Sequence, residues 1–161
     1  MFKKIHKTAY PPSRPTLYWD EHCGFCHYWR LRWELLTEGN VAFVPYQEAA
    51  EDFKDIPLKE FKKASRLIEP DGKIYSGPDS AYRSLYHAGT ERWHQWYKKY
   101  RWFQYLSDHG YNHIAKNRPF YFKITRALFG KNPRSPKPYW LYYLLIFVVF
   151  ILLIFFEVYG F

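Results

Sequence analysis

The sequence predicts an α/β domain built on a four-stranded mixed sheet with flanking helices, followed by a helical basic extension and one C-terminal transmembrane helix. One supporting observation is an order of expected elements, β-α-β-α-β-β-α, that packs naturally as helices layered on a sheet. The other is the run of 18 residues at 139–156, which holds no charge, Gly or Pro. Such a run is near the length needed to cross a bilayer core of roughly 30 Å. The remaining residues, roughly 138, suit one domain.

The first three elements are expected within residues 16–44. Residues 16–19 (TLYW) form a short β-prone run. From 23 to 36 the aromatic and aliphatic residues recur at helical spacing, and Gly39 is a suitable helix end. Residues 41–44 (VAFV) then read as a buried strand ended by Pro45. This β-α-β order spans about 30 residues, the size of a parallel crossover unit.

The next elements complete the predicted sheet. A short helix is expected at 58–64. Two β-prone runs, 65–68 and 73–76, flank the turn sequence EPDG at 69–72 and predict a β-hairpin. A helix at 79–87 follows this hairpin.

Residues 91–130 are basic and rich in aromatic side chains, and they predict two amphipathic helices at about 92–106 and 109–129, the second weakened by Pro119. The aromatic side chains either pack on the sheet or lie at a bilayer interface, where aromatic and basic residues gather. A nucleic-acid surface is a third interpretation. Because no RNA-binding signature is present, no nucleic acid is expected as a partner.

Charge is divided unevenly along the chain. Residues 1–91 carry 13 basic and 13 acidic side chains, whereas 92–137 carry 11 basic side chains and the single acid Asp108. The excess positive charge thus borders the hydrophobic run, and the positive-inside rule places the N-terminal domain in the cytoplasm of a single-pass membrane protein. The same charge favours anionic lipid head groups as partners.

The N-terminus has basic residues but no apolar stretch of the kind found in signal peptides. The predicted organisation of the chain has five parts. The parts are a basic lead-in at 1–15, a dithiol domain at 16–90, the basic aromatic extension at 91–130, a linker at 131–138 and the transmembrane helix at 139–159.

The two cysteines, Cys23 and Cys26, form a C-x-x-C at the expected start of a helix directly after a strand. Unpaired N–H groups and the helix dipole favour a thiolate at the first position, and the thiolate is the nucleophile in thiol chemistry. One helical turn brings the second sulfur within disulfide reach, so that it can resolve a mixed disulfide. We therefore expect Cys23 to be the nucleophile and Cys26 the resolving thiol. His22 either stabilises the thiolate or is a solvated loop residue.

Asp20 lies three residues before Cys23, at the end of the strand. Its carboxylate either takes a proton from Cys26 during resolution or accepts N–H bonds from the turn. In either role, a nearby anion opposes thiolate formation.

Three segments resemble the DCC family of thiol-disulfide oxidoreductases, a thioredoxin-like group. LYWDEHCGFC is similar to its D-x-x-C-x-x-C motif after a strand, and EPDGKIYSGPDSAYRSL to its P-D-G segment with the following helix. YNHIAKNRPFYF is similar to its Y-x-x-I-A-x-N-R segment. The resemblance covers about residues 16–122 and implies a thioredoxin-like fold, thiol-disulfide exchange with a protein or small-molecule substrate, and Asp20, Cys23 and Cys26 as the functional residues.

Other interpretations of these residues stay open. Zinc binding would pair the cysteines with His109 and His113, whose spacing suits a metal, although they lie far along the chain. A second alternative is that the cysteines are inert core thiols. A third is that the chain is a membrane-associated adaptor that keeps the fold without catalysis. Residues 116–118 (KNR) either bind an anion or cap a helix, and a solvated helix end is the simpler interpretation. The leading interpretation requires no cofactor and no metal.

Overall fold

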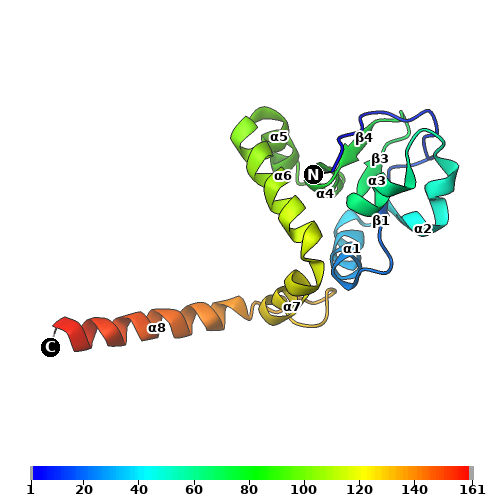
Figure 1. Cartoon of the computed structure of the whole chain (residues 1–161). Helices are drawn as coiled ribbons and strands as arrows, with labels where there is room; N and C mark the ends of the chain where they lie inside the picture. The colour runs from blue at the N-terminus through cyan, green and yellow to red at the C-terminus, as the bar shows by residue number, and fades with distance from the viewer. Residues whose placement is uncertain (1, 160–161) are drawn as a thin grey trace.

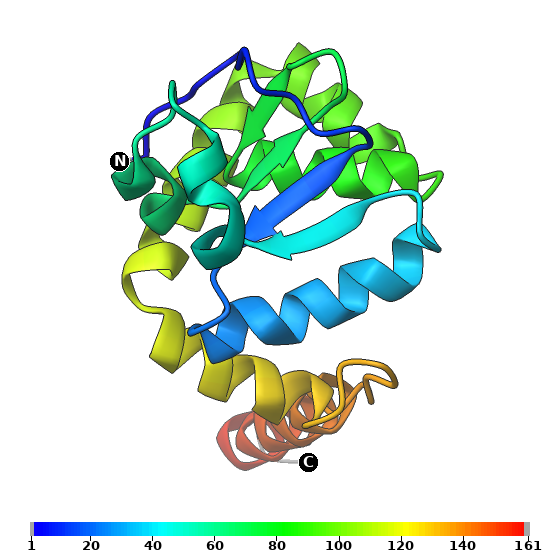
Figure 2. The same cartoon turned by 90° about the vertical axis from the view of Figure 1, so that its right-hand side faces the viewer.

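The computed structural model describes residues 2–159 and contains the predicted four-stranded mixed sheet. The strand order is β2-β1-β3-β4, with β1 parallel to β2 and antiparallel to β3, and with β3 antiparallel to β4. The strands are β1 Thr16–Trp19, β2 Ala42–Pro45, β3 Arg66–Ile68 and β4 Ile74–Ser76. The sheet and its flanking helices are seen in Figure 2.

Helix α1, Gly24–Thr37, is the crossover between the parallel strands β1 and β2. It ends where Glu38 takes a left-handed conformation with φ 47°, and Gly39 follows with φ 84°. Glycine adopts positive φ without steric cost, so the chain turns sharply here and enters β2. The predicted helix end at Gly39 is therefore confirmed to within two residues.

The two faces of the sheet hold separate apolar clusters, because successive side chains of a strand point to opposite faces. Leu17, Trp19 and Leu67 are buried on one face, next to α1. Tyr18 and Ile68 are buried on the other face. That second face is covered by α2 Tyr46–Ala49, the 3₁₀ turn Ala50–Asp52 and α3 Leu58–Lys63. The sequence predicts only the last of these three, since α2 is a single helical turn directly after Pro45.

The N-terminal lead-in runs along the hairpin. Thr8 N–H donates to Gly72 O, and Ile74 N–H donates to His6 O, each at 2.9 Å. Phe2 is buried and packs edge-to-face on Tyr111. The lead-in thus extends the pairing beyond β4.

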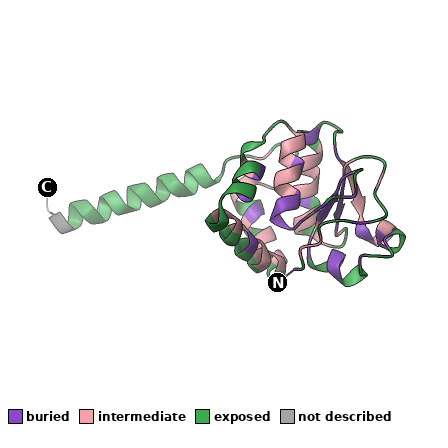
Figure 3. Ribbon diagram, turned by 90° about the horizontal axis from the view of Figure 1, so that it is seen from above, coloured by how far each residue is buried: buried purple, intermediate pink, exposed green. Residues whose placement is uncertain are grey.

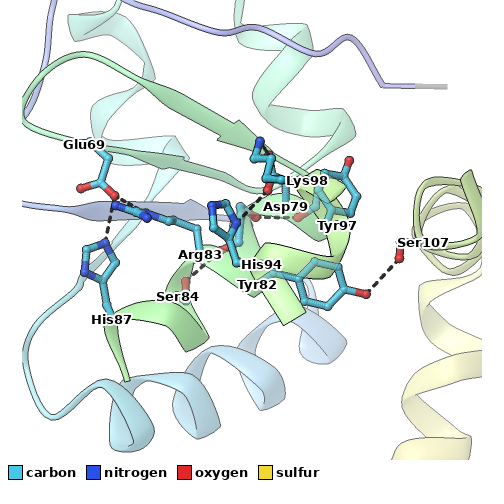
Figure 4. Close-up of polar contacts among 12 residues, drawn as sticks. Glu69, Asp79, Tyr82, Arg83, Ser84, His87, His94, Tyr97, Lys98 and Ser107 are labelled. Carbon is cyan, nitrogen blue, oxygen red and sulfur yellow. Dashed lines mark hydrogen bonds and ion pairs between the residues drawn. The ribbon is translucent and has the colours of Figure 1, made fainter. Parts of the chain in front are cut away.

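Helix α4, Pro78–His87, packs on β3 and β4, and α5, Arg92–Lys99, packs on α4. A polar network joins these elements (Figure 4). Glu69 binds Arg83 and His87 through one carboxylate oxygen, at 2.7 and 2.9 Å. Asp79 lies 2.6 Å from Lys98 Nζ and 3.2 Å from His94 Nδ1.

The basic extension contains three helices, and the prediction of two is wrong. After α5 come α6, Arg101–Lys116, and α7, Arg118–Phe129. The breaks fall at Tyr100, which is extended, and at Asn117. Pro119 lies in the first turn of α7, where a missing N–H has no helical partner to lose, so this proline begins a helix instead of weakening one.

The aromatic side chains of the extension divide between packing and solvent. Tyr97 is 2% exposed, whereas Trp102 and Tyr105 are 61% and 65% exposed. Tyr97 is therefore packed inside the protein, whereas Trp102 and Tyr105 are exposed. A bilayer interface for the exposed side chains stays a prediction.

Helix α8, Trp140–Tyr159, extends away from the rest of the chain (Figure 1). Its side chains are exposed as far as residue 157 (Figure 3). Within residues 2–159 it is the one helix long and apolar enough to cross a membrane.

Candidate active site

The two cysteines lie at the N-terminus of α1, after the turn that follows β1. Cys23 is the N-cap residue, and its Sγ accepts a hydrogen bond from the backbone N–H of Cys26 at 3.2 Å. The sulfur occupies the place usually taken by a Ser or Asp oxygen and satisfies one of the unpaired N–H groups of the first turn. Negative charge on Cys23 is therefore favoured by the helix itself.

The thiols are close enough to act as a pair. Both cysteines are free, and Cys26 Sγ lies 2.6 Å from Cys23 Sγ. Each residue is partly exposed. The expectation that one helical turn brings the second sulfur beside the first is confirmed.

The pKa of Cys23 is lowered to about 6. The largest cause is the hydrogen bond that the Cys26 thiol donates to Cys23 Sγ, and burial opposes it. The Cys26 backbone N–H and the positive charge of Arg118 lower this pKa further, while the Asp20 carboxylate raises it. At neutral pH the first cysteine is thus mainly thiolate.

The pKa of Cys26 is raised. Its proton is held first by the hydrogen bond to Cys23, then by burial and by the negative charge on the neighbouring sulfur. The two thiols consequently differ in protonation, one charged and one neutral, as attack and resolution require.

Asp20 faces the dithiol turn and has three side-chain hydrogen bonds. Its Oδ1 accepts from Gln47 Nε2 at 2.8 Å and from His22 N–H at 3.2 Å, and its Oδ2 accepts from Arg118 Nη1 at 2.9 Å. The bond from His22 is the turn-stabilising contact expected of an Asp before a helix. Asp20 also lines the cavity that contains Cys26.

Arg118 is the site residue that sequence reasoning missed. The interpretation of residues 116–118 as a solvated helix end is wrong for Arg118, whose side chain is 19% exposed and paired with Asp20 across 98 positions of sequence. Its Nη2 also donates to Lys62 O at 3.3 Å. Two signals pointed to it: a carboxylate at the end of a buried strand needs a partner, and the third family-like segment contains this arginine.

Two close contacts hold α6 and α7 against the dithiol domain. Tyr111 on α6 accepts from Ser65 N–H at 3.0 Å, just before β3. On the α7 side, a Cβ at Gly24 would lie 3.0 Å from the Phe122 ring, so the absence of a side chain at Gly24 allows this approach to α1. The extension is thereby part of the site.

A cavity of about 490 Å³ opens beside the second thiol, between α1, α4, α6 and α7. Cys26, Asp20 and Arg118 are among the residues that line it. Most of its wall is aromatic or aliphatic and includes Phe25, Trp29, Trp33, Tyr82, Ile114 and Tyr121.

The side-chain contacts of His22, His109 and His113 within residues 2–159 involve neither cysteine. His22 is largely exposed, and His109 Nδ1 lies 2.9 Å from Tyr105 O. His113 packs against Tyr121. Within residues 2–159, no group of three or more His, Cys, Asp or Glu side chains could hold a metal ion.

The strand, the dithiol at a helix N-terminus and the paired carboxylate together define a thioredoxin-like dithiol site. Residues 17–124 match the family of DCC1-like thiol-disulfide oxidoreductases. The chain therefore belongs to this family, as its three motifs predicted. No curated protein and no solved structure matches the chain.

Proposed function

We propose that this protein is a membrane-anchored thiol-disulfide oxidoreductase in which Cys23 attacks and Cys26 resolves. The observation that carries the assignment is the position of Cys23 Sγ, which caps α1 and lies 2.6 Å from Cys26 Sγ. A thiolate favoured at the N-cap and a neutral thiol beside it form the pair needed for disulfide exchange.

In the first step, the Cys23 thiolate attacks one sulfur of a substrate disulfide. A bond forms between Cys23 Sγ and that sulfur, the substrate disulfide breaks, and the other substrate sulfur leaves as a thiolate. In the second step, deprotonated Cys26 attacks Cys23 Sγ and releases the second substrate thiolate. The protein dithiol is then oxidised to a disulfide and the substrate is reduced to two thiols, and the same steps run in reverse for a reduced substrate.

Asp20 serves the second step as the acceptor of the Cys26 proton. Three observations support this role: its carboxylate follows β1, lines the same cavity as Cys26 and is held by Gln47 and Arg118. Arg118 is a positioning residue, because it orients this carboxylate and its positive charge favours thiolates at both cysteines.

The membrane anchor is α8, and the domain faces the cytoplasm. The exposed apolar surface of α8 supports the anchor. The basic side chains before it, Lys131, Arg134 and Lys137, support the orientation and an affinity for anionic head groups. Thiol or disulfide groups of proteins or small molecules are the substrates, and nucleic acid is not.

Trapping tests this function directly. The Cys26→Ser variant should accumulate mixed disulfides through Cys23 when the full chain is expressed in cells, because the resolving thiol is absent. The Cys23→Ser variant is the matched control and should accumulate none. Equal recovery of mixed disulfides from the two variants, or a dithiol that stays reduced across a glutathione redox titration, would contradict the proposal.

A further inference from the structure

Helix α6 carries large apolar side chains on its solvent side. Trp102, Tyr105 and Leu106 are 61%, 65% and 63% exposed. Their spacing of three and four residues places them on one face of the helix, and the exposed residues His109 and His113 continue that face. These five residues are called the outer face of α6. Exposed apolar side chains gathered in this way mark an interaction surface.

The opposite side of α6 supplies the packing of this helix. Ser107, Tyr111 and Ile114 line the cavity beside Cys26, and Asp108 is buried. Because these residues hold α6 against the domain, the outer face is not needed for the fold. It can therefore contact something outside the chain.

Aromatic rings continue this surface from α6 onto α5. Trp96 and Tyr100 are exposed, with ring centres 6.2 Å apart, and the Tyr100 ring lies 6.3 Å from that of Trp102. Cations lie among these rings, with Arg92 over Trp96 at 5.7 Å and Lys99 over Tyr100 at 5.5 Å. Aromatic rings mixed with cations are typical of a protein surface at a bilayer interface.

The exposed charge of this region has one sign. Asp108 is the only acidic residue in 92–137, and it is buried and paired with Lys4. Its other carboxylate oxygen accepts from the Tyr97 hydroxyl at 2.6 Å. No exposed acid within 92–137 thus balances cations such as Lys99 and Arg101, so the surface attracts anions.

The outer face of α6 and the proposed membrane helix lie on the same side of the domain. Figures 1 and 2 show α5 and α6 on the side of the sheet toward which α8 projects. The start of α8 is held close to the end of α7. Lys137 N–H donates to Phe129 O at 2.9 Å, and a Cβ at Gly130 would lie 3.2 Å from the Tyr139 ring. A bilayer around α8 would therefore begin near α7 and extend toward the outer face of α6.

We propose that the outer face of α6 docks on an anionic bilayer, with Trp102, Tyr105 and Leu106 among the head groups and Lys99 and Arg101 on their phosphates. This proposal rests on the proposed anchor α8. Docking removes the apolar side chains from water and gives the cations anionic partners. Because α8 tethers the domain, the contact is intramolecular and needs little intrinsic affinity.

The measurement uses the full chain with Cys23→Ser and Cys26→Ser, so that thiol chemistry takes no part. A single introduced cysteine carries an environment-sensitive fluorophore, either at His109→Cys on the outer face or at Lys59→Cys on α3, which covers the other face of the sheet. In nanodiscs of phosphatidylserine and phosphatidylcholine, the label at residue 109 should emit at shorter wavelength and be quenched by doxyl-labelled lipid. The label at residue 59 should show neither effect.

Two double variants test the two forces separately, with the label at residue 109. Trp102→Ser with Leu106→Ser removes apolar groups from exposed positions, where folding is not at risk, and should abolish most of the quenching. Lys99→Gln with Arg101→Gln should lower the ratio of docked to undocked chain by about fivefold for each charge removed.

Lys54→Gln with Lys59→Gln is the matched control, because it removes two exposed cations from the other side of the domain. It should change the ratio of docked to undocked chain less than about twofold, since those charges lie beyond the screening distance from the lipid. Raising the salt from about 0.1 M to 1 M shortens the Debye length from about 10 Å to 3 Å and should likewise weaken docking.

Three results would overturn the docking surface. If the label at residue 109 emits like the label at residue 59 in a chain that is embedded in the nanodisc, docking is wrong and the anchor stands. If carbonate extracts the chain from membranes, the anchor and docking are wrong together. If the shift at residue 109 occurs in detergent and grows with protein concentration, the outer face binds a second copy of the chain instead of lipid. The trapping experiment on the dithiol is independent of all three.

Discussion

Arg118 Nη1 donates to Asp20 Oδ2 at 2.9 Å, and this contact joins the start of α7 to the turn that carries the dithiol. Both side chains are about four-fifths buried. An ion pair in a partly desolvated position is stronger than one in water, and removal of one partner leaves the other charge uncompensated. The chemistry at Cys23 is therefore coupled, through Asp20, to an arginine that lies 98 positions from Asp20 in sequence.

The first prediction concerns this arginine. Arg118→Met removes a positive charge that lowers the pKa of Cys23 and leaves Asp20 unpaired, and both changes disfavour the thiolate. If the pKa rises from about 6 to about 7, the thiolate fraction at pH 6 falls about fivefold. The rate of Cys23 alkylation as a function of pH measures this change.

Lys123→Met is the matched control, because it removes a cation from an exposed position of the same helix. Its alkylation profile should coincide with that of the wild type. The double variant Asp20→Asn/Arg118→Met should recover part of the lost reactivity, since the uncompensated anion is gone. An unchanged profile in Arg118→Met would show that the helix N-terminus and Cys26 suffice.

The second prediction is a pH dependence of stability in the reduced protein. Cys23 has a pKa of about 6 when folded and about 8.5 in an unfolded chain. Between these values the unfolded state binds more protons, so the reduced protein should gain stability as the pH rises from 6 to 8.5 and lose it as the pH falls back through 6. Thermal unfolding of the reduced and oxidised forms at several pH values measures the effect.

The oxidised form lacks both titrating thiols and supplies the internal reference. As the pH rises from 6 to 8.5, the melting temperature of the reduced protein should rise relative to that of the oxidised protein. In Cys23→Ser the same pH dependence should disappear. A constant difference in the wild type would mean that the Cys23 pKa is not lowered.

The central fold was predictable because its signals are local. The strand at 16–19, the helical spacing after Cys23 and the P-D-G hairpin each follow from a short stretch of sequence, and all three occur in the structure. The position of Cys23 at the start of α1 follows in the same way, since the strand before it and the helical spacing after it are both local signals.

Arg118 and the cavity could not be derived locally. Arg118 reaches the site because α6 leads the chain to α7, which packs against α1, and nothing near residue 118 encodes that path. The break at Tyr100 also escaped prediction, because helix-forming residues lie on both sides of it. The cavity needs walls from four helices, so its presence depends on tertiary packing alone.

The third prediction concerns orientation. With the domain in the cytoplasm, a cysteine-free chain carrying a reactive tag at residue 1 should stay unlabelled by an impermeant reagent in intact cells and become labelled after lysis. The excess positive charge of residues 92–137 is the physical reason. Replacing Lys131, Arg134 and Lys137 with Gln should weaken the preference. Labelling of the wild-type tag in intact cells would reverse the assignment.

The final prediction separates two roles of Asp20. If its carboxylate takes the proton of Cys26, Asp20→Asn should slow resolution of the mixed disulfide. Attack by Cys23 should be unchanged or faster, because the Asp20 anion raises the pKa of this thiol.

If Asp20 only stabilises the turn, the Asn oxygen can still accept from His22 N–H, and both steps should survive with a stability loss of about 1 kcal/mol. Stopped-flow reduction of a model disulfide by the wild type and Asp20→Asn, compared across pH 6 to 9, resolves the two phases. Gln47→Leu is the matched control, since it removes one hydrogen bond to the carboxylate and keeps the charge. A second phase that is unchanged at every pH would rule out proton transfer and leave Asp20 as the residue that holds Arg118 and the turn in place.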